Sequence, residues 1–303
     1  MAITYHDLSL NTRSAMAAAG IEAAQLETKE LLCAASGKTG EELLRDMSLY
    51  TTDEVAQAVE GMLARRLAGE PIAYIIGEWS FCGLPLYVTP QVLIPRADTE
   101  MLAQLAMNRL KERRGHTRIL DLCAGTGCVG LTAAAYLKDT RAVLVDLADG
   151  ALDLCKKNIR RHKLSARVVC LKGDALQAPS HALGQFDVLV CNPPYIPTGD
   201  IPGLDHSVKD YEPILALDGG TDGLDFYRAV TTLWKPAIKP GGYLLYEVGI
   251  GQAEKVAWLL VKAGYENIRI TRDPGGIDRV VEGQRPVELE LPKLSQEVLQ
   301  EEP

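Results

Sequence analysis

Short apolar runs alternate with longer amphipathic stretches after Gly115, and this alternation restricts the fold more than any other feature of the chain. The apolar runs are rich in β-branched residues and predict strands, whereas the longer stretches predict helices. Strands that alternate with helices at this spacing form a doubly wound, mostly parallel sheet, so the expected fold class is α/β. We expect strands near residues 118–121, 142–146, 167–171, 186–191, 242–248, 266–271 and 278–283, with helices at about 127–138, 149–162, 222–235 and 251–263.

A tight connection, Asp273-Pro274-Gly275-Gly276, joins the last two predicted strands. Proline and glycine in such a short connection favour a turn and are compatible with an antiparallel hairpin. We therefore predict a seven-stranded sheet that is mostly parallel and has an antiparallel hairpin at one end.

The first 71 residues predict a small helical domain. Alanine is abundant in them, apolar residues recur at helical spacing, and Thr52-Asp53 has the side chains of a helix N-cap. No residue here has the side chain of a catalytic site, so we interpret residues 1–71 as a binding or packing module. The apolar positions that carry the pattern are Leu26, Leu31, Leu32, Val55, Val59, Met62 and Leu63.

The pattern changes after Pro71. Ile72, Tyr74 and Ile76 alternate as in a strand, and further strand-like residues follow up to Pro95. We predict that residues 72–95 form a β-hairpin that connects the helical domain to the main domain.

The main domain is expected to span residues 96–285. Its first helix should run from about Asp98 to Arg113, with Asp98 or Thr99 as the N-cap. Residues 286–303 have several glutamates and leucines and are interpreted as a peripheral C-terminal tail.

Charge and composition limit the partners of the chain. The formal net charge of −8 argues against nucleic acid as the principal partner, because phosphate binding usually needs a basic face. No apolar run approaches the roughly 18–20 residues that span a bilayer, and no signal peptide is expected. The seven cysteines form no C-x-x-C pair, and the five histidines form no metal-spaced cluster. We expect a cytoplasmic protein with reduced thiols and no metal.

The first predicted strand of the main domain ends at Asp121 and leads into a glycine-containing turn, Cys123-Ala124-Gly125-Thr126-Gly127. The glycines let the backbone approach a ligand closely, and the N-terminus of the following helix favours acceptor or anionic groups. The spacing is not the G-x-G-x-x-G pattern of dinucleotide folds. Taken alone, this stretch could be only a tight strand-to-helix turn.

Two further acids follow the next two strands. Asp146 ends the second strand and could accept hydrogen bonds from both ribose hydroxyls of an adenosine, although it could instead cap the next helix. Asp174 and Ala175 follow the third strand, where a carboxylate and a backbone N–H could bind an adenine ring. Three such positions at successive strand ends predict a nucleoside pocket more specifically than any one of them does.

The fourth strand ends in Asn192-Pro193-Pro194-Tyr195. Two consecutive prolines have no N–H and cannot continue a strand ladder. The strand must therefore stop with an amide side chain and unbonded carbonyls at its carboxyl end, which is the edge where parallel α/β sheets bind ligands. The alternative reading is that these four residues form an ordinary turn.

This tetrapeptide predicts methyl transfer to a planar nitrogen. An amide nitrogen is a poor nucleophile, so it must be aligned with the S–CH₃ bond of a sulfonium and needs acceptors for the growing positive charge. The Asn192 oxygen and the Pro193 carbonyl could accept the two N–H hydrogens, while Tyr195 packs over the amide. We predict Asn192, Pro193 and Tyr195 as catalytic residues, with Pro194 completing the substrate site. Glu247 and Gln252 either shape this pocket or only pack.

Several stretches of the chain resemble the PrmC/HemK family, the peptide-chain release factor glutamine methyltransferases. The resemblance implies a class I, Rossmann-like fold and S-adenosylmethionine as cofactor, bound by Asp121, Cys123–Gly127, Asp146, Asp174, Ala175 and Asn192. It also implies that the substrate is the glutamine of the Gly-Gly-Gln motif in class-1 release factors, engaged by the helical domain. The matching stretches are Arg65-Arg66, Gly69 to Gly77, Val92 to Arg96, Thr99-Glu100, the turn after Asp121, Asn192 to Tyr195, Glu212-Pro213, Asp222 to Leu224 and Gly276 to Val281.

Three positions depart from the family pattern. Cys123 stands where a glycine is usual, Ala97 stands where a proline is usual, and Ala175 stands where a large apolar or aromatic residue often follows the third-strand acid. None of these changes removes a group that the predicted transfer needs.

Two other functions remain open on the residues alone. An adenine-N6 methyltransferase of DNA or RNA would use the same tetrapeptide, and a non-enzymatic adenosine-binding module would use the same turns. The acidic balance and the helical domain favour a protein substrate without direct nucleic-acid binding, and we expect a monomer that does not bind membranes.

Overall fold

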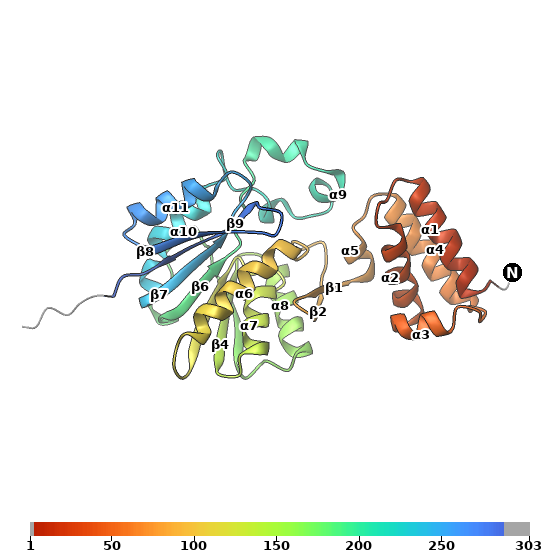
Figure 1. Ribbon diagram of the computed structural model, residues 1–303, viewed down its shortest axis with the longest axis horizontal. Coiled ribbons are helices and arrows are strands. Elements are labelled where there is room, and N and C mark those ends of the chain that lie inside the picture. The colour runs from red at the N-terminus through yellow and green to blue at the C-terminus, as the bar shows by residue number, and fades with distance from the viewer. Residues whose placement is uncertain (1–2, 288–303) are drawn as a thin grey trace, which may run out of the picture.

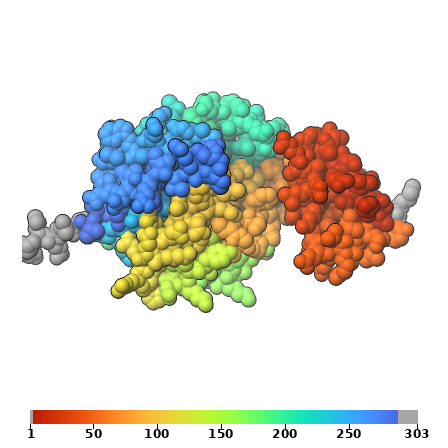
Figure 2. Space-filling model, in the orientation of Figure 1, coloured from red at the N-terminus to blue at the C-terminus, as the bar shows by residue number. Residues whose placement is uncertain are grey.

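The computed structural model describes residues 3–287. Figure 1 shows a group of short helices at the N-terminal end beside a sheet covered by helices, and Figure 2 shows these helices as a lobe next to a larger body. Most of the predicted tail, residues 288–303, lies outside the described residues. Within residues 3–287, no helix is long and apolar enough to cross a membrane.

Threonine caps begin three helices of the N-terminal lobe. The hydroxyls of Thr4, Thr39 and Thr52 each accept a hydrogen bond from a backbone N–H in the first helical turn, which satisfies a group that has no partner within the helix. The predicted cap at Thr52 is therefore confirmed. The helices of the lobe are α1 (Tyr5–Ala18), α2 (Ala24–Ser36), α3 (Gly40–Arg45) and α4 (Asp53–Leu67).

The strand expected at residues 72–76 is wrong, because these residues form a short helix, α5 (Ile72–Ile76). Pro71 precedes the helix, and Gly77 ends it with a φ of 77°, a left-handed conformation that glycine adopts without strain. Ile75 is buried with Met16 and Leu31 of the N-terminal lobe. Five apolar residues are too few to distinguish a strand from a helix by periodicity.

Other residues of α5 face the larger body. Ala73 and Tyr74 are buried in a second cluster with Val88 and Ile94. The helix therefore packs against both parts of the molecule. The predicted hairpin is shorter than expected and follows α5, with antiparallel strands β1 (Glu78–Phe81) and β2 (Leu84–Tyr87).

The larger body contains the seven-stranded sheet that the sequence predicts. Its strand order is β5-β4-β3-β6-β7-β9-β8, and the first five strands in this order are parallel. The last two strands form the predicted antiparallel hairpin, with β9 inserted between β7 and β8. The strands are β3 (Thr117–Leu122), β4 (Thr140–Asp146), β5 (Val168–Lys172), β6 (Phe186–Cys191), β7 (Ile238–Glu247), β8 (Glu266–Arg272) and β9 (Asp278–Gln284).

Helices bury both faces of the sheet, as a doubly wound fold requires. One core is closed by α6 (Ala97–Lys111), α7 (Cys128–Tyr136) and α8 (Asp149–Arg161). The other core is closed by α10 (Asp225–Leu233) and α11 (Ala253–Lys262). Every residue of β6 is buried, so this strand lies at the centre of the body.

The N-cap predicted at Asp98 or Thr99 is wrong. Helix α6 begins at Ala97, and its N-cap Arg96 makes no side-chain capping bond. Both expected residues have other partners, because Asp98 pairs with Arg279 at 3.0 Å and the Thr99 hydroxyl accepts a hydrogen bond from Asn192.

The segment between β6 and α10 crosses the carboxyl edge of the sheet. It contains the short helix α9 (His206–Lys209) and two 3₁₀ segments, Thr198–Gly203 and Ile214–Ala216. Tyr211 donates a hydrogen bond to the carbonyl of Ala68 at 3.1 Å, which joins this segment to the N-terminal lobe. The 3₁₀ turns of the body are His181–Leu183, Thr198–Gly203, Ile214–Ala216 and Lys235–Ala237.

Candidate active site

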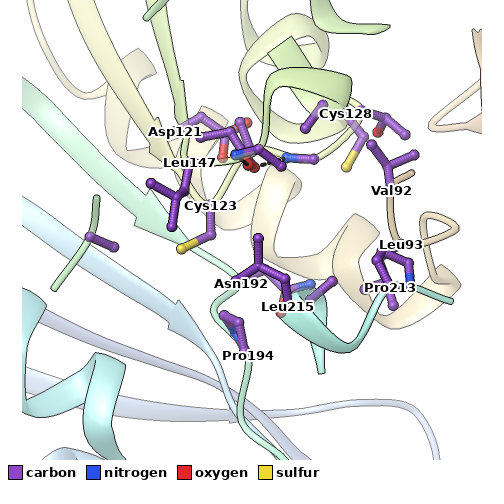
Figure 3. A pocket seen from close by; sticks show the side chains of 18 of the residues that line it. Val92, Leu93, Asp121, Cys123, Cys128, Leu147, Asn192, Pro194, Pro213 and Leu215 are labelled. Atoms are coloured by element: carbon purple, nitrogen blue, oxygen red, sulfur yellow. Dashed lines mark hydrogen bonds between the residues drawn. The ribbon is translucent and has the colours of Figure 1, made fainter. Parts of the chain in front are cut away.

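A cavity opens at the carboxyl ends of β3, β4, β5 and β6 (Figure 3). Parallel α/β sheets bind ligands at this edge. The cavity is lined by residues 91–93, 95, 99, 121, 123–126, 128, 129, 146–148, 151, 173–175, 192, 194, 213, 215, 216 and 226.

Most of the predicted site residues line this cavity. Asp121, the turn from Cys123 to Thr126, Asp146, Asp174, Ala175, Asn192 and Pro194 are all among the lining residues. Pro193, Tyr195 and Gly127 are not.

Gly127, which is predicted as a ligand contact, also has a packing role. Its φ is 81°, and a Cβ at this position would lie 2.8 Å from the Leu144 side chain and 3.2 Å from the Cys155 sulfur. Glycine is required at this N-cap of α7 because helix and sheet approach each other closely.

The Asp121 carboxylate fixes the start of α7. Asp121 is 3% exposed, and its Oδ2 accepts a hydrogen bond from the Gly130 N–H at 2.8 Å. Burial raises the pKa of Asp121 to about 7, and the hydrogen bond from Gly130 opposes this rise. Cys123 follows with a φ of 60°, a conformation that L-residues rarely adopt, which explains why glycine suits this position.

The Asp146 carboxylate holds the turn through backbone hydrogen bonds. Its Oδ2 accepts from the Gly125 N–H at 2.8 Å, and its Oδ1 accepts from the Ala148 N–H at 3.0 Å. Each carboxylate oxygen has a second lone pair, so both can still accept from a ligand hydroxyl. Asp146 therefore joins the ends of β3 and β4 and retains the capacity to bind a ribose.

Asp174 and Ala175 lie beyond β5 on the wall of the cavity. One oxygen of Asp174 accepts from the Leu176 N–H at 2.8 Å, which fixes a local turn. The Ala175 carbonyl accepts from the Trp234 indole at 3.0 Å, so it is anchored to the core under α10. The small side chain of Ala175 leaves this wall open to a flat ligand.

The Thr126 hydroxyl is the clearest sign that the cavity takes a polar ligand. It is buried and makes no hydrogen bond within residues 3–287. A buried polar group without a partner is costly, and a ligand in the cavity would satisfy it. The unpaired hydroxyl, the free lone pairs of Asp146 and the apolar walls fit an adenosine that carries a charged side chain.

Asn192 projects from the end of β6 into the cavity, between the Asp121–Cys123 wall and the Pro213–Leu215 wall (Figure 3). Its Nδ2 donates a hydrogen bond to the Thr99 hydroxyl at 3.2 Å. This hydrogen bond occupies the amide nitrogen, so the amide oxygen is the atom left to accept from a ligand.

The remainder of the tetrapeptide is fixed by hydrogen bonds behind the cavity. The Tyr195 carbonyl accepts from the Gln252 amide at 2.8 Å, and the Ile196 N–H donates to the Leu217 carbonyl at 2.9 Å. Gly219 passes so close that a Cβ there would lie 2.7 Å from the Tyr195 Cα. Burial raises the pKa of Tyr195 to about 12, so its hydroxyl stays protonated.

Two walls of the cavity were not predicted as site residues from the sequence. One is formed by residues 91–95, and the other by Pro213, Leu215 and Ala216. The first belongs to a stretch that the family resemblance includes, so that stretch is the signal that could have identified it. In the second wall, Pro213 belongs to the matching stretch Glu212-Pro213, whereas Leu215 and Ala216 have no signal of their own and reach the site only through the path of the chain after β6.

The sheet order, the acid-bearing turns and the cavity at the strand ends define a methyltransferase of the class I, S-adenosylmethionine-dependent type. The sequence matches the family described as PrmC N-terminal domain over residues 8–77, and the Methyltransferase small domain over residues 97–201. The chain belongs to the family of release factor glutamine methyltransferases, on the similarity to the following relatives.

The release factor glutamine methyltransferase of Geobacter sulfurreducens is 41% identical over 273 residues, which cover 90% of this chain and 94% of that protein. The enzyme of the same name from Moorella thermoacetica is 40% identical over 269 residues, covering 87% and 92%. Among solved structures, the hMettl16 catalytic domain in complex with MAT2A 3'UTR hairpin 6 has a TM-score of 0.54 and 14% identity, covering 80% of this chain and 85% of that one. At that identity the likeness concerns the fold alone.

Proposed function

We propose that this chain transfers a methyl group from S-adenosylmethionine to the side-chain amide nitrogen of the glutamine in the Gly-Gly-Gln motif of class-1 release factors. The observation that carries this proposal is the Asn192 amide, held by a hydrogen bond to Thr99 on the wall of the cavity. The names of the relatives support the choice of substrate.

The residues that would hold the cofactor are those of the three strand ends. Asp146 would accept from the ribose hydroxyls, Asp174 and the backbone at Ala175 would bind the adenine, and the turn from Cys123 to Thr126 would surround the amino-acid end. S-adenosylmethionine supplies an electrophilic methyl group on a positively charged sulfur.

The role of the chain in the transfer is to orient and to stabilise. The Asn192 oxygen and the Pro193 carbonyl would accept the two N–H hydrogens of the glutamine amide, so that its lone pair points at the methyl group. The same acceptors would stabilise the positive charge that grows on nitrogen. No strong base is needed, because the extra proton of the product can leave to water. Tyr195, which lies outside the cavity lining, would support the substrate edge from behind.

The proposal includes a monomer in the cytoplasm that binds release factors and neither membranes nor free nucleic acid. It also includes the division into domains 1–71, 72–95, 96–285 and 286–303. The PrmC N-terminal match ends at residue 77 and therefore includes α5, which packs on both parts.

The deciding experiment supplies radiolabelled S-adenosylmethionine with a class-1 release factor, the same factor with its Gly-Gly-Gln glutamine replaced by alanine, and DNA or RNA. We expect label on the unmodified factor alone. Label on nucleic acid and not on the factor would identify an adenine-N6 methyltransferase. If the chain binds the cofactor but transfers label to none of these molecules, it is an adenosine-binding module and not a methyltransferase.

A further inference from the structure

A buried carboxyl that the proposed transfer does not use lies directly behind Asn192. Glu247 is the last residue of β7 and is 3% exposed. Strands β6 and β7 are parallel, and Cys191 pairs with Tyr246. The next residue of each strand, Asn192 and Glu247, therefore leave the sheet side by side at the carboxyl edge.

Three side chains from three elements meet at this point. The Asn192 Nδ2 donates to the hydroxyl of Thr99, which lies in the first turn of α6 and is 2% exposed. Hydrogen bonds from both Thr99 and Asn192 act on the Glu247 carboxyl and lower its pKa, against the larger effect of burial. The Oε2 atom of Glu247 is buried without a hydrogen-bond partner among the described residues. Thr99 and Glu247 are buried, and Asn192 is half-buried at the cavity wall.

The cluster contains acceptors where the Asn192 nitrogen lies. An Asn side chain can exchange its nitrogen and oxygen by a half-turn, and the partners decide which arrangement is stable. The Thr99 hydroxyl and the Glu247 carboxylate can both accept from Nδ2, and a carboxylate would oppose an amide oxygen in the same place. The nitrogen is therefore held at the back and the oxygen faces the cavity.

We propose that Glu247, together with Thr99, is a positioning residue that locks the Asn192 amide with its oxygen toward the substrate amide. This inference rests on the proposed function, because it assigns the lock a role in that transfer. Glu247 does not touch the reacting atoms and acts through Asn192.

The charge state of Glu247 gives the lock a pH dependence. Burial raises the pKa of Glu247 to about 7, with Asp98 adding to this rise and Arg279 opposing it. Below that pH the carboxyl carries a proton. Its O–H can then face the Asn192 NH₂ group, which is also a donor, and this weakens the lock. The rate of transfer should therefore rise as the pH increases through about 7. The titratable groups that face Glu247 are Asp98 of α6, Arg279 of β9, Tyr195, Tyr227 of α10 and Cys128 of α7.

Three variants test the lock in the full-length protein with a release factor as substrate. Glu247→Leu keeps the volume but removes the acceptor, and Thr99→Val does the same for the hydroxyl. Misplacing a catalytic group by about 1 Å can cost 100-fold in rate, so we expect kcat to fall by roughly 10- to 100-fold in both, with cofactor affinity changed less than about threefold. Glu247→Gln resembles the protonated carboxyl, with one acceptor and one donor, so we expect its kcat to stay at the low-pH value of the wild type and not to rise near pH 7.

A matched control is Glu282→Gln. Glu282 is a buried glutamate of β9 that pairs with Arg109 away from the cavity. This variant should lower stability and leave the pH profile of transfer unchanged.

The proposal is overturned if Glu247→Leu retains the wild-type kcat, or if Glu247→Gln keeps the rise near pH 7. A loss of cofactor binding that accounts for the whole effect would also overturn it, since Glu247 would then support only the fold. If Glu247→Leu does not fold, the isosteric Glu247→Gln and Thr99→Val decide the result. Failure of the wild-type protein to methylate the factor would instead reject the proposed function.

Discussion

The Asn192 side chain lines the cavity and donates a hydrogen bond to Thr99, which lines it too. Truncating it to alanine removes the oxygen that would accept from the substrate but none of the hydrogen bonds that hold the cofactor turn. We expect Asn192→Ala to lower kcat by at least about 100-fold, the scale of losing one charge-stabilising group, and to leave cofactor affinity nearly unchanged. Rate assays with a release factor and calorimetric titration of cofactor would measure both. A large loss of cofactor affinity would show that the role of Asn192 is misassigned.

Asp146 has two roles in the proposed function. Its two oxygens hold the backbone N–H groups of Gly125 and Ala148, and they would also accept from the ribose hydroxyls of the cofactor. Asp146→Ala should weaken the cofactor by about 10- to 100-fold, since it removes hydrogen bonds to a charged group that are each worth roughly 1.5–3 kcal/mol. Titration of S-adenosylmethionine would measure this. The control is Asp149→Ala, three residues further on, where the exposed carboxylate pairs only with Lys172. Equal affinity in the two variants would contradict the ribose contact.

At the residue scale, the strand-end positions were predictable and their couplings were not. The sequence places Asp121, Asp146 and Asn192 at strand ends, and parallel strands bring their ends to one edge. Their hydrogen-bond partners come from residues far away along the chain, since Asn192 and Thr99 are 93 positions apart. The sequence also allows Asp146 to cap the next helix. In the structure, α8 has no side-chain cap, and the Asp146 carboxylate accepts hydrogen bonds from Ala148 and from Gly125 in the turn after β3.

At the scale of elements, a buried ion pair joins α6 to β9. Arg109 donates to both oxygens of Glu282 at 3.0 and 2.6 Å, and its guanidinium lies 4.4 Å from the centre of the Tyr243 ring. The hydrogen bonds with Glu282 raise the pKa of Arg109, so Arg109 stays charged.

Replacing Arg109 by methionine would leave the Glu282 charge buried without its partner. Breaking a buried pair in this way costs about 3–5 kcal/mol, so we expect Arg109→Met to lower the free energy of unfolding by that amount. Urea unfolding would measure it. Arg228→Met is the matched control, because Arg228 pairs with Asp222 and Asp225 at the surface and such pairs are worth about 1 kcal/mol or less. A similar loss in both variants would argue against the buried pair.

The elements that were predicted correctly have a strong period or a strong breaker. The strands of the sheet fall within a few residues of their expected positions because each is a short apolar run between turn signals. Helix α5 is not predicted from the sequence because its residues are buried in two clusters. The other buried members of these clusters lie far from α5 along the chain, so no local pattern shows the contacts. The start of α6 was misplaced because Asp98 and Thr99 form tertiary contacts in place of caps.

At the scale of the whole molecule, the N-terminal lobe contacts the larger body through α5 and through the segment after β6. The same segment carries Pro213 and Leu215, which line the cavity. Tyr211 in that segment donates to Ala68 of the lobe. The lobe is therefore placed to influence which substrates reach the cavity.

A chain of residues 72–303, which keeps α5 and the hydrogen bond from Tyr74 to the Val92 carbonyl, should separate cofactor binding from substrate binding. Among the described residues, the cavity lining begins at Gln91, so we expect cofactor affinity to change by less than about threefold. We expect the KM for the release factor to rise at least about tenfold. A tenfold rise corresponds to the loss of about 1.4 kcal/mol of binding free energy. Circular dichroism would confirm that the shortened chain folds. An unchanged KM would show that the lobe does not engage the factor.

The position of β9 between β7 and β8 has a consequence for the time during which the chain is synthesised. Strand β7 carries Glu247 and has no partner on its outer side until β9 is made, which ends 37 residues later at Gln284. At a synthesis rate of about 5–20 residues per second, this leaves the edge of β7 unpaired for about 2–7 s. Unpaired strand edges promote aggregation. Premature termination of translation between these two strands would therefore release an aggregation-prone fragment.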